Sequence, residues 1–255
     1  MKDEDLILGV DVGGSGIKGG IVNTQTGELL TERYKFATPK PATPESVAKT
    51  IKKLIKHFKW KGAVGCGFPS IIRKGIAITA ANIDKSWIGE DIKQRFEEIG
   101  KRPFYILNDA DAAGLAEVKF GAGKGVNGTV LMITIGSGIG TGLFLDGKLL
   151  PNSEFGHLEF KGMLAEHYAS SAAKEREGLD METWARRFNE YLHHLDRLLS
   201  VDLYILGGGI SRMFDEFKDY LDVEGKVVPA FFQNNAGTIG AAYYARLGSK
   251  AGEKR

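Results

Sequence analysis

The chain has 255 residues, enough for one large domain or two smaller lobes that each bury a hydrophobic core. A hydrophobic content of 43% and a net charge of +2 are ordinary for a globular protein, so nothing in the composition indicates nucleic acid as a partner. The single cysteine, Cys66, excludes an internal disulfide and a multi-cysteine metal site, and no stretch is typical of a membrane span or a signal peptide, so we expect a cytoplasmic protein.

One local pattern occurs twice: an apolar run rich in β-branched residues, a glycine-rich turn and a second apolar run. The copies occupy residues 7–22 and 132–145, and each is followed by a turn that predicts a third strand, Thr26-Gly27 or Asp146-Gly147. Glycine lets backbone N–H groups approach an anion closely because no Cβ lies in the way. Two such units predict two related lobes, each with an anion-binding loop.

The residues after each glycine-rich turn favour a strand. Dinucleotide-binding loops and Walker loops both need a helix at this position, and neither copy ends in Gly-Lys-Ser/Thr. The sequence therefore argues against both kinds of site. A hairpin that only turns the chain is the alternative for either loop, but two matching copies favour phosphate binding.

Strands and helices alternate in both halves of the chain, which predicts two α/β lobes with a cleft between them. We expect residues 1–108 to form the N-terminal lobe and residues 109–255 the C-terminal lobe, with the last helix packing back on the first lobe. The expected elements between and after the hairpins are a helix at 47–58, a strand at 62–68, a helix at 92–99, a strand at 104–107, a helix at 112–116, a loop-rich stretch at 151–165, a helix at 184–199, a strand at 203–206 and a helix at 237–247.

Asp109 is the leading catalytic candidate, because it lies where a strand ends and a helix begins. A helix N-cap formed by Asp109 or Asp111 is the alternative. The neighbouring Asn108 and the two phosphate-type loops favour the catalytic role.

Glu154 and His157 concentrate hydrogen-bonding groups in a predicted loop. A Glu-x-x-His pair could supply two zinc ligands, but a structural site needs about four and no cysteine lies nearby, so we expect no zinc. Carboxylate and imidazole groups also suit the vicinal hydroxyls of a sugar, whereas a solvated loop is the alternative. Glu166, at the start of the next predicted helix, would join this set or interact with the helix end.

A run of three glycines, Gly207, Gly208 and Gly209, follows a predicted strand. It could hold the ribose and base of a nucleotide, or it could permit a tight connection between the strand and the next segment. The sequence leaves both readings open.

Five motifs stand in one order: residues 11–18, 108–109, 135–140, 154–157 and 206–209. This order resembles the ROK family of sugar kinases, and residues 81–87, 108–117 and 151–159 are similar to its polyphosphate glucokinases. The resemblance implies a two-lobed, actin-like ATPase (ribonuclease H-like) α/β fold, with duplicated β-hairpin/α units and an interlobe cleft. Most family members carry a cysteine-rich zinc motif after the Glu-x-Gly-His segment, which this chain lacks.

The resemblance implies phosphorylation of glucose at its 6-hydroxyl by polyphosphate or ATP, with Mg²⁺ and in a homodimer. Asp109 would be the general base, and Asp11 would orient Mg²⁺ through water. The sugar would be bound by Asn108, Glu154, His157 and Glu166, with Asn82 and Gly67 as further candidates. The terminal phosphate would be held by Gly13, Gly14, Ser15 and Lys18, and the following ones by Thr134, Gly136, Ser137 and Gly138. A nucleotide would contact Gly207, Gly208 and Gly209.

Two alternatives belong to the same resemblance. One is an ATP-dependent kinase of glucose, mannose or another hexose. The other is a sugar-binding regulator, which we disfavour because the first glycine loop begins only a few residues from Met1 and leaves no room for the DNA-binding domain of such proteins.

Overall fold

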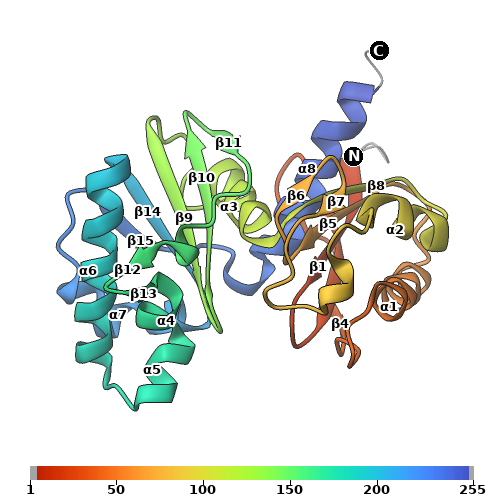
Figure 1. Cartoon of the computed structure of the whole chain (residues 1–255). Coiled ribbons are helices and arrows are strands. Elements are labelled where there is room, and N and C mark those ends of the chain that lie inside the picture. Colours follow the sequence, from red (N-terminus) through yellow and green to blue (C-terminus); the bar gives the residue numbers. More distant parts are fainter. Residues whose placement is uncertain (1–4, 253–255) are drawn as a thin grey trace. The chain divides into compact units, whose positions relative to one another are not determined.

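The computed structural model describes residues 5–252, which form two compact units (Figure 1). The first unit contains the chain up to Ala116 together with the residues from Gly237 onward, and the second contains Glu117–Ala236. Helix α3 (Asp109–Phe120) therefore begins in one unit and ends in the other. Within the described residues, no helix is both long and apolar enough to cross a membrane.

A six-stranded sheet organises the first unit. Its strand order is β3-β2-β1-β5-β8, with β4 also paired to β2. β1 and β2 form an antiparallel hairpin, whereas β1, β5 and β8 are parallel and end at one edge of the sheet. The strands are β1 (Leu6–Val12), β2 (Ile17–Asn23), β3 (Glu28–Leu29), β4 (Tyr34–Phe36), β5 (Val64–Phe68) and β8 (Phe104–Asn108).

Helices α1 (Pro44–His57) and α2 (Ile92–Gly100) belong to this unit and begin at side-chain caps, Thr43 and Asp91. Their apolar faces are buried in the core with Trp87 of the 3₁₀ turn η2 (Lys85–Trp87). The short strands β6 (Ile72–Arg73) and β7 (Ile76–Ala77) form a hairpin.

The backbone of the last helix, α8 (Ala236–Gly252), packs directly against the backbones of β5 and α3. A Cβ on Gly65 of β5 would overlap the carbonyl oxygen of Ala241, and a Cβ on Gly240 would overlap that of Ala112 in α3. Glycine at these two positions is therefore what allows α8 to pack on β5 and α3 within the first unit.

A five-stranded sheet with the order β11-β10-β9-β14-β15 organises the second unit. Its antiparallel hairpin is followed by parallel strands, as in the first unit, so the repeated sequence pattern occupies equivalent places in the two sheets. The predicted α/β class and duplicated hairpins are confirmed. The strands are β9 (Thr129–Ile135), β10 (Ile139–Leu145), β11 (Lys148–Leu150), β14 (Leu203–Gly208) and β15 (Lys226–Pro229).

The core of the second unit lies between this sheet and the long helix α6 (Met181–Leu199), where Trp184 and Phe188 stack with ring centroids 5.3 Å apart. The segment 151–165, predicted as a loop, contains the short elements η3 (Phe155–His157), β12 (Glu159–Phe160) and β13 (Met163–Leu164), which are too short to show a periodicity in the sequence.

The other short elements of the second unit are α4 (Ala165–Ala169), α5 (Ser171–Glu177), η4 (Gly209–Met213), α7 (Phe214–Phe217), η5 (Lys218–Tyr220) and η6 (Gln233–Asn235).

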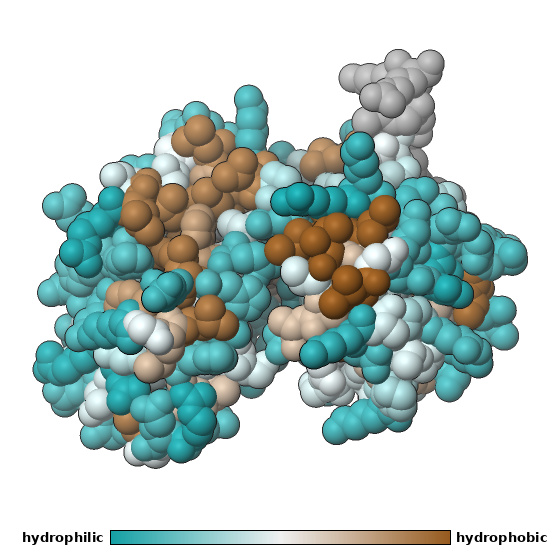
Figure 2. Space-filling model, in the orientation of Figure 1, coloured by the Kyte–Doolittle hydropathy of each residue, from teal (hydrophilic) through white to brown (hydrophobic). Residues whose placement is uncertain are grey.

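Apolar side chains reach the surface of each unit. In the first unit they gather over the β6–β7 hairpin, where Ile76 and Ile78 are exposed (Figure 2). In the second they gather over β10 and β11, where Leu145 and Leu150 are more than half exposed (Figure 2).

The packing of α8 predicts the effect of a single methyl group. Gly65→Ala would place a Cβ on the rigid α8 backbone, and we expect the free energy of unfolding to fall by about 1–3 kcal/mol. Gly20→Ala in β2 is the control, because its Cβ would mainly meet the flexible end of Leu29. Urea denaturation of both variants measures the difference; equal stability would contradict the close α8 contact.

Candidate functional site

The first glycine loop is held in shape by its own backbone. Gly13 N–H donates to the Gly16 carbonyl at 3.1 Å, and Gly16 N–H donates back to Gly13 at 3.3 Å. The Thr38 hydroxyl also donates to the Gly13 carbonyl at 2.5 Å. Among residues 5–252, the exposed Gly14 and Ser15 at the tip have N–H groups without a hydrogen-bond partner, so this tip can donate to an anion.

Charged side chains flank this loop on neighbouring strands. Asp11 of β1 pairs in register with Lys18 of β2, and the Lys18 Nζ lies 3.3 Å from Asp11 Oδ2. Lys18 in turn pairs in register with Lys35 of β4, whose side chain crosses Gly16. The first unit therefore presents a carboxylate and two cations beside the Gly13–Gly16 turn.

Asn108 and Asp109 lie at the carboxyl end of β8. The Asn108 Oδ1 accepts from the N–H groups of Ala110 at 2.9 Å and Asp111 at 3.1 Å, and its Nδ2 donates to the Ser70 carbonyl at 3.2 Å. Asn108 therefore caps the first turn of α3. Asp109 is half-buried, and its Oδ1 accepts from Ala110 N–H at 2.9 Å.

Gly67 lies one strand away from this pair. A Cβ on Gly67 would lie 3.3 Å from the Ala112 Cβ and 3.5 Å from the Asp109 Cα, so the glycine lets the start of α3 come close to β5. Gly67 pairs in register with Asp11 on its other side. Asp11, Gly67 and Asp109 therefore share one edge of the first sheet.

Asn82 lies beside the first glycine loop. It lines a small pocket of about 100 Å³ with Gly13, Gly14 and Lys40. Lys35 and Lys40 are two further cations near this loop that no local sequence pattern indicates, because the position of Lys35 follows from its strand register with Lys18.

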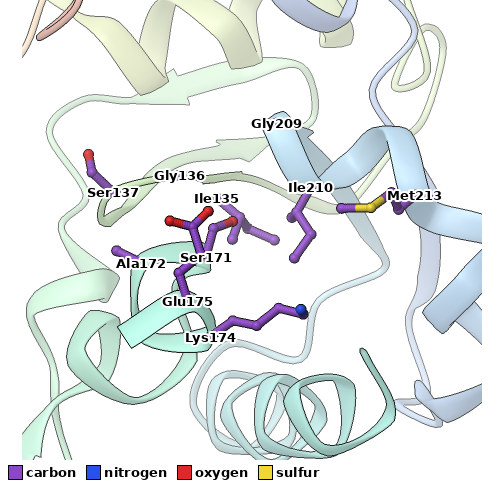
Figure 3. Close-up of a pocket in the computed structure, with 10 residues that line it drawn as sticks. All are labelled: Ile135, Gly136, Ser137, Ser171, Ala172, Lys174, Glu175, Gly209, Ile210 and Met213. Carbon is purple, nitrogen blue, oxygen red and sulfur yellow. The ribbon is translucent and has the colours of Figure 1, made fainter. Parts of the chain in front are cut away.

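The second glycine loop borders a pocket of about 440 Å³ (Figure 3). Gly136 N–H donates to the Gly138 carbonyl at 3.0 Å, and Ala172 N–H at the start of α5 donates to the Gly136 carbonyl at 3.2 Å. Figure 3 shows Ile210 and Met213 on the side of the pocket away from Ser137. Lys174 and Glu175 of α5 also line the pocket (Figure 3). The pocket thus combines backbone, hydroxyl and charged groups with the apolar side chains of Ile210 and Met213.

The three consecutive glycines differ in backbone conformation and in the space around their Cα atoms. Gly208 has φ +84° and its Cβ would overlap the Ile135 carbonyl, while the Cβ of Gly207 would lie 2.5 Å from the Met132 methyl group. Gly209 has open space around its Cα and lines the pocket. Close backbone packing therefore requires glycine at Gly208, whereas Gly207 meets only the end of a flexible side chain and Gly209 lines the pocket.

Glu154, His157 and Glu166 form a cluster in the second unit. The His157 Nδ1 lies 3.4 Å from Glu154 Oε2, and its Nε2 lies 3.6 Å from Glu166 Oε1. Burial raises the pKa of the Glu154 carboxyl; His157 partly opposes this increase, and Glu166 adds to it. Two carboxylates on either side of an imidazole provide several acceptors and a donor for hydroxyl groups.

This cluster is fastened to the strand that follows the second loop. Glu166 Oε2 accepts from Ile139 N–H at 3.2 Å, and a Cβ on Gly156 would overlap the Ile139 carbonyl. The Thr141 hydroxyl donates to the Ser153 carbonyl at 2.9 Å. Since Ile139 directly follows Gly138, the cluster and the loop are held in a defined relation within the second unit.

Within residues 5–252, no group of three or more His, Cys, Asp or Glu side chains could by itself hold a metal ion. A bound cation would accordingly need ligands from water or from a substrate.

The raised pKa of Glu154 has a testable consequence for stability. The folded state disfavours the ionised carboxylate, so its ionisation lowers stability as pH rises through the folded pKa, and this loss is absent below the unfolded pKa. We expect Glu154→Gln to raise the Tm by about 2–4 °C at pH 7.5, the shift that about 1 kcal/mol produces in a chain of this size.

The gain from Glu154→Gln should vanish as the pH approaches 4, which melting curves between pH 4 and 8 would show. Glu159→Gln, at an exposed position nearby, is the control. A Tm gain that does not change with pH would argue against burial of the Glu154 charge as its cause.

Comparison with known proteins gives consistent matches. The profile of the ROK family matches residues 7–167. The polyphosphate glucokinase of Mycobacterium tuberculosis is 48% identical over 236 residues, which cover 92% of this chain and 89% of that protein. The glucokinase of Streptomyces coelicolor is 33% identical over 191 residues, covering 67% of this chain and 58% of that protein.

Solved structures show the same relationship. The inorganic polyphosphate/ATP-glucomannokinase from Arthrobacter sp. strain KM superposes with a TM-score of 0.92 at 46% identity, covering 95% of this chain and 99% of that one. The ROK family glucokinase from Streptomyces griseus, solved with glucose and AMPPNP, gives a TM-score of 0.82 at 26% identity over 95% and 99% of the two chains. The fold is thus that of the actin-like ATPases, and the chain belongs to the ROK family.

Proposed function

We propose that the protein transfers a phosphoryl group from inorganic polyphosphate or ATP to the 6-hydroxyl of glucose. The observation that carries this proposal is the half-buried Asp109 carboxylate at the sheet edge that also bears Asp11 and the first glycine loop. Relatives at 46–48% identity are named polyphosphate glucokinase and polyphosphate/ATP-glucomannokinase, which supports the same reaction.

Asp109 acts as the general base that takes the proton from the 6-hydroxyl as its oxygen attacks the terminal phosphorus. Phosphoryl transfer depends mainly on the positioning of the reactants and on stabilisation of negative charge. A single correctly positioned carboxylate is therefore sufficient to activate the hydroxyl of the acceptor. The cap formed by Asn108 fixes the first turn of α3 and thereby the backbone that carries Asp109.

The glycine loops stabilise the negative charge of the donor. The free N–H groups of Gly14 and Ser15, together with Gly13 and the Lys18 ammonium, would bind the phosphoryl group that is transferred. The second loop would hold the phosphates behind it, through Thr134, Gly136, Ser137 and Gly138.

The residues beside the first loop fit a magnesium ion. Mg²⁺ keeps several waters and is typically held by one or two carboxylates plus substrate phosphates, and the part-exposed Asp11 offers one carboxylate. Asp11 would hold the ion through water, and the ion would neutralise charge on the phosphates. Lys18 keeps the Asp11 carboxylate oriented through their 3.3 Å ion pair.

Glu154, His157 and Glu166 would accept and donate hydrogen bonds to the sugar hydroxyls, with Asn108, Asn82 and the Gly67 backbone as further contacts. Because Gly156 and Thr141 fasten this cluster to β10, the hydroxyl partners are positioned before the sugar arrives. Mannose is a second candidate sugar, since the Arthrobacter relative is named a glucomannokinase.

A strictly ATP-dependent hexose kinase is the second candidate function. The pocket at the second loop favours it, because Ile210 and Met213 offer an apolar surface suited to a base and Gly209 leaves room for a ribose. Gly207 and Gly208 would support that nucleotide site through the backbone alone.

A homodimer and a cytoplasmic location complete the proposal. The apolar residues exposed on β10 and β11 would suit a subunit contact.

Removal of the base tests the mechanism. We expect Asp109→Ala to lower kcat by roughly 10²–10⁴-fold, because proton transfer to a placed carboxylate contributes about that much. Calorimetry should show glucose binding within a few-fold of the unaltered protein. Turnover close to that of the unaltered protein would exclude Asp109 as the base.

The donor is tested with purified protein, glucose and Mg²⁺, with long-chain polyphosphate or ATP as the sole donor. We expect glucose 6-phosphate from polyphosphate, and omission of Mg²⁺ with added chelator should abolish it. Product from ATP alone would leave the ATP-dependent hexose kinase as the function.

A further inference from the structure

A basic groove lies in the first unit, between the end of α1 and the end of α2. Its volume is about 390 Å³, and its floor is formed by Ile55, Ile99 and the half-buried Trp60. Six cationic side chains line it: Lys52, Lys56, Lys59, Lys61, Lys101 and Arg102.

The positive charge of this groove is not neutralised locally. No carboxylate lines the groove, and within residues 5–252 its five lysines take part in no ion pair. Nearby lysines outside the groove do pair: Lys49 with Glu45 and Lys93 with Glu97. On a chain with a net charge of only +2, this is a local concentration of cations.

Parts of the groove are built at specific backbone positions. The Arg102 guanidinium donates to the carbonyls of Lys101 at 2.6 Å and Trp60 at 3.2 Å, which holds it at the rim. Lys59 and Lys101 have φ values of 49° and 53°, in the left-handed region that favours glycine or asparagine.

The groove is separate from the candidate phosphoryl-transfer residues. It lies at the amino ends of β5 and β8, whereas Gly67 and Asp109 lie at their carboxyl ends. A five-residue strand spans roughly 17 Å, which is the approximate separation of the two regions. An ion bound in the groove would therefore not contact the reacting phosphate.

Helix α1 connects the two regions. Ala42, just before α1, lines the pocket that contains Gly13 and Lys40, and Lys56, in the last turn, lines the groove. The helix has 14 residues and is about 21 Å long. A polyanion held at the first glycine loop therefore needs a length of at least about 21 Å to reach the groove as well.

We propose that this basic groove binds a remote part of a long inorganic polyphosphate chain whose reacting end is held by the two glycine loops. The proposal rests on the polyphosphate donor proposed above. Each phosphate unit carries negative charge and no apolar group, so it suits lysine ammonium groups on flexible stems. A chain long enough to occupy both the glycine loops and the groove would bind more tightly than a short one, although its contacts at the reacting phosphate are the same.

The lining favours inorganic polyphosphate over a nucleic acid. Binding of single strands uses successive aromatic side chains on which bases stack. The groove has one aromatic residue, Trp60, whose indole N–H is engaged with the Ala63 carbonyl at 2.8 Å and whose ring packs on Gly62. A groove with one half-buried ring offers no row of stacking surfaces, so its charge fits a phosphate chain that has no bases.

The test is a triple variant, Lys56→Glu, Lys59→Glu and Lys61→Glu, assayed with long-chain polyphosphate, tripolyphosphate and ATP. We expect the KM for the long chain to rise roughly ten-fold or more and its dependence on log salt to become shallower by about two, since three phosphate contacts are lost. The KM for tripolyphosphate and ATP, and kcat with every donor, should stay unchanged.

A matched control reverses three exposed lysines elsewhere: Lys124→Glu, Lys226→Glu and Lys250→Glu. It changes the net charge equally and should leave the long-chain KM within about two-fold. An equal rise in this control, or an equal rise for tripolyphosphate and ATP in the groove variant, would overturn the proposal.

Direct binding measurements test whether the groove binds polyphosphate or a nucleic acid. Fluorescently labelled long-chain polyphosphate should bind the groove variant more weakly than the unaltered protein, while activity with ATP shows that the variant is folded. Tighter, groove-dependent binding of single-stranded RNA would make a nucleic acid the occupant instead. If the unaltered protein does not use polyphosphate, the donor proposal fails; if it does and the groove variant is indistinguishable from it, only the groove proposal fails.

Discussion

The parallel register of β1, β5 and β8 is the constraint on which the candidate chemistry of the first unit depends. Asp11 pairs with Gly67, and Phe68 pairs with Asn108, so three segments far apart in sequence end at one sheet edge. Because side chains alternate between faces along a strand, a slip of one residue would turn each of these groups to the opposite face. The apolar core under this sheet therefore also maintains the relation between Asp11 and Asp109.

Close backbone approach plays the corresponding part in the second unit. Gly156 allows the turn that carries Glu154 and His157 to meet the Ile139 carbonyl, and Glu166 bonds to the N–H of the same residue. A cluster that would lie in a mobile loop is thereby attached to a strand of the sheet. This attachment buries the Glu154 carboxylate, and the desolvation of its charge, which raises its pKa, costs free energy.

The basic groove and the glycine loop give the first unit two regions for anions with different physical properties. The loop presents backbone N–H groups in a fixed geometry, which suits one phosphoryl group that must be positioned for transfer. The groove presents flexible ammonium groups, which would suit the remote part of the proposed polyphosphate chain. A donor with many equivalent phosphates would use both properties.

The sequence by itself determined the α/β class, the duplicated hairpins and the family, because strand periodicity and glycine-rich turns are local patterns. It also placed Asp109 at the end of a strand, but it left open whether Asp109 capped the helix. Only the tertiary structure decided that Asn108 caps the first turn of α3, that Gly208 packs against the backbone of Ile135 while Gly209 lines a pocket, and that Lys35 lies beside Lys18. These outcomes depend on strand register and on contacts between distant segments, such as Gly208 with Ile135, which no local pattern encodes.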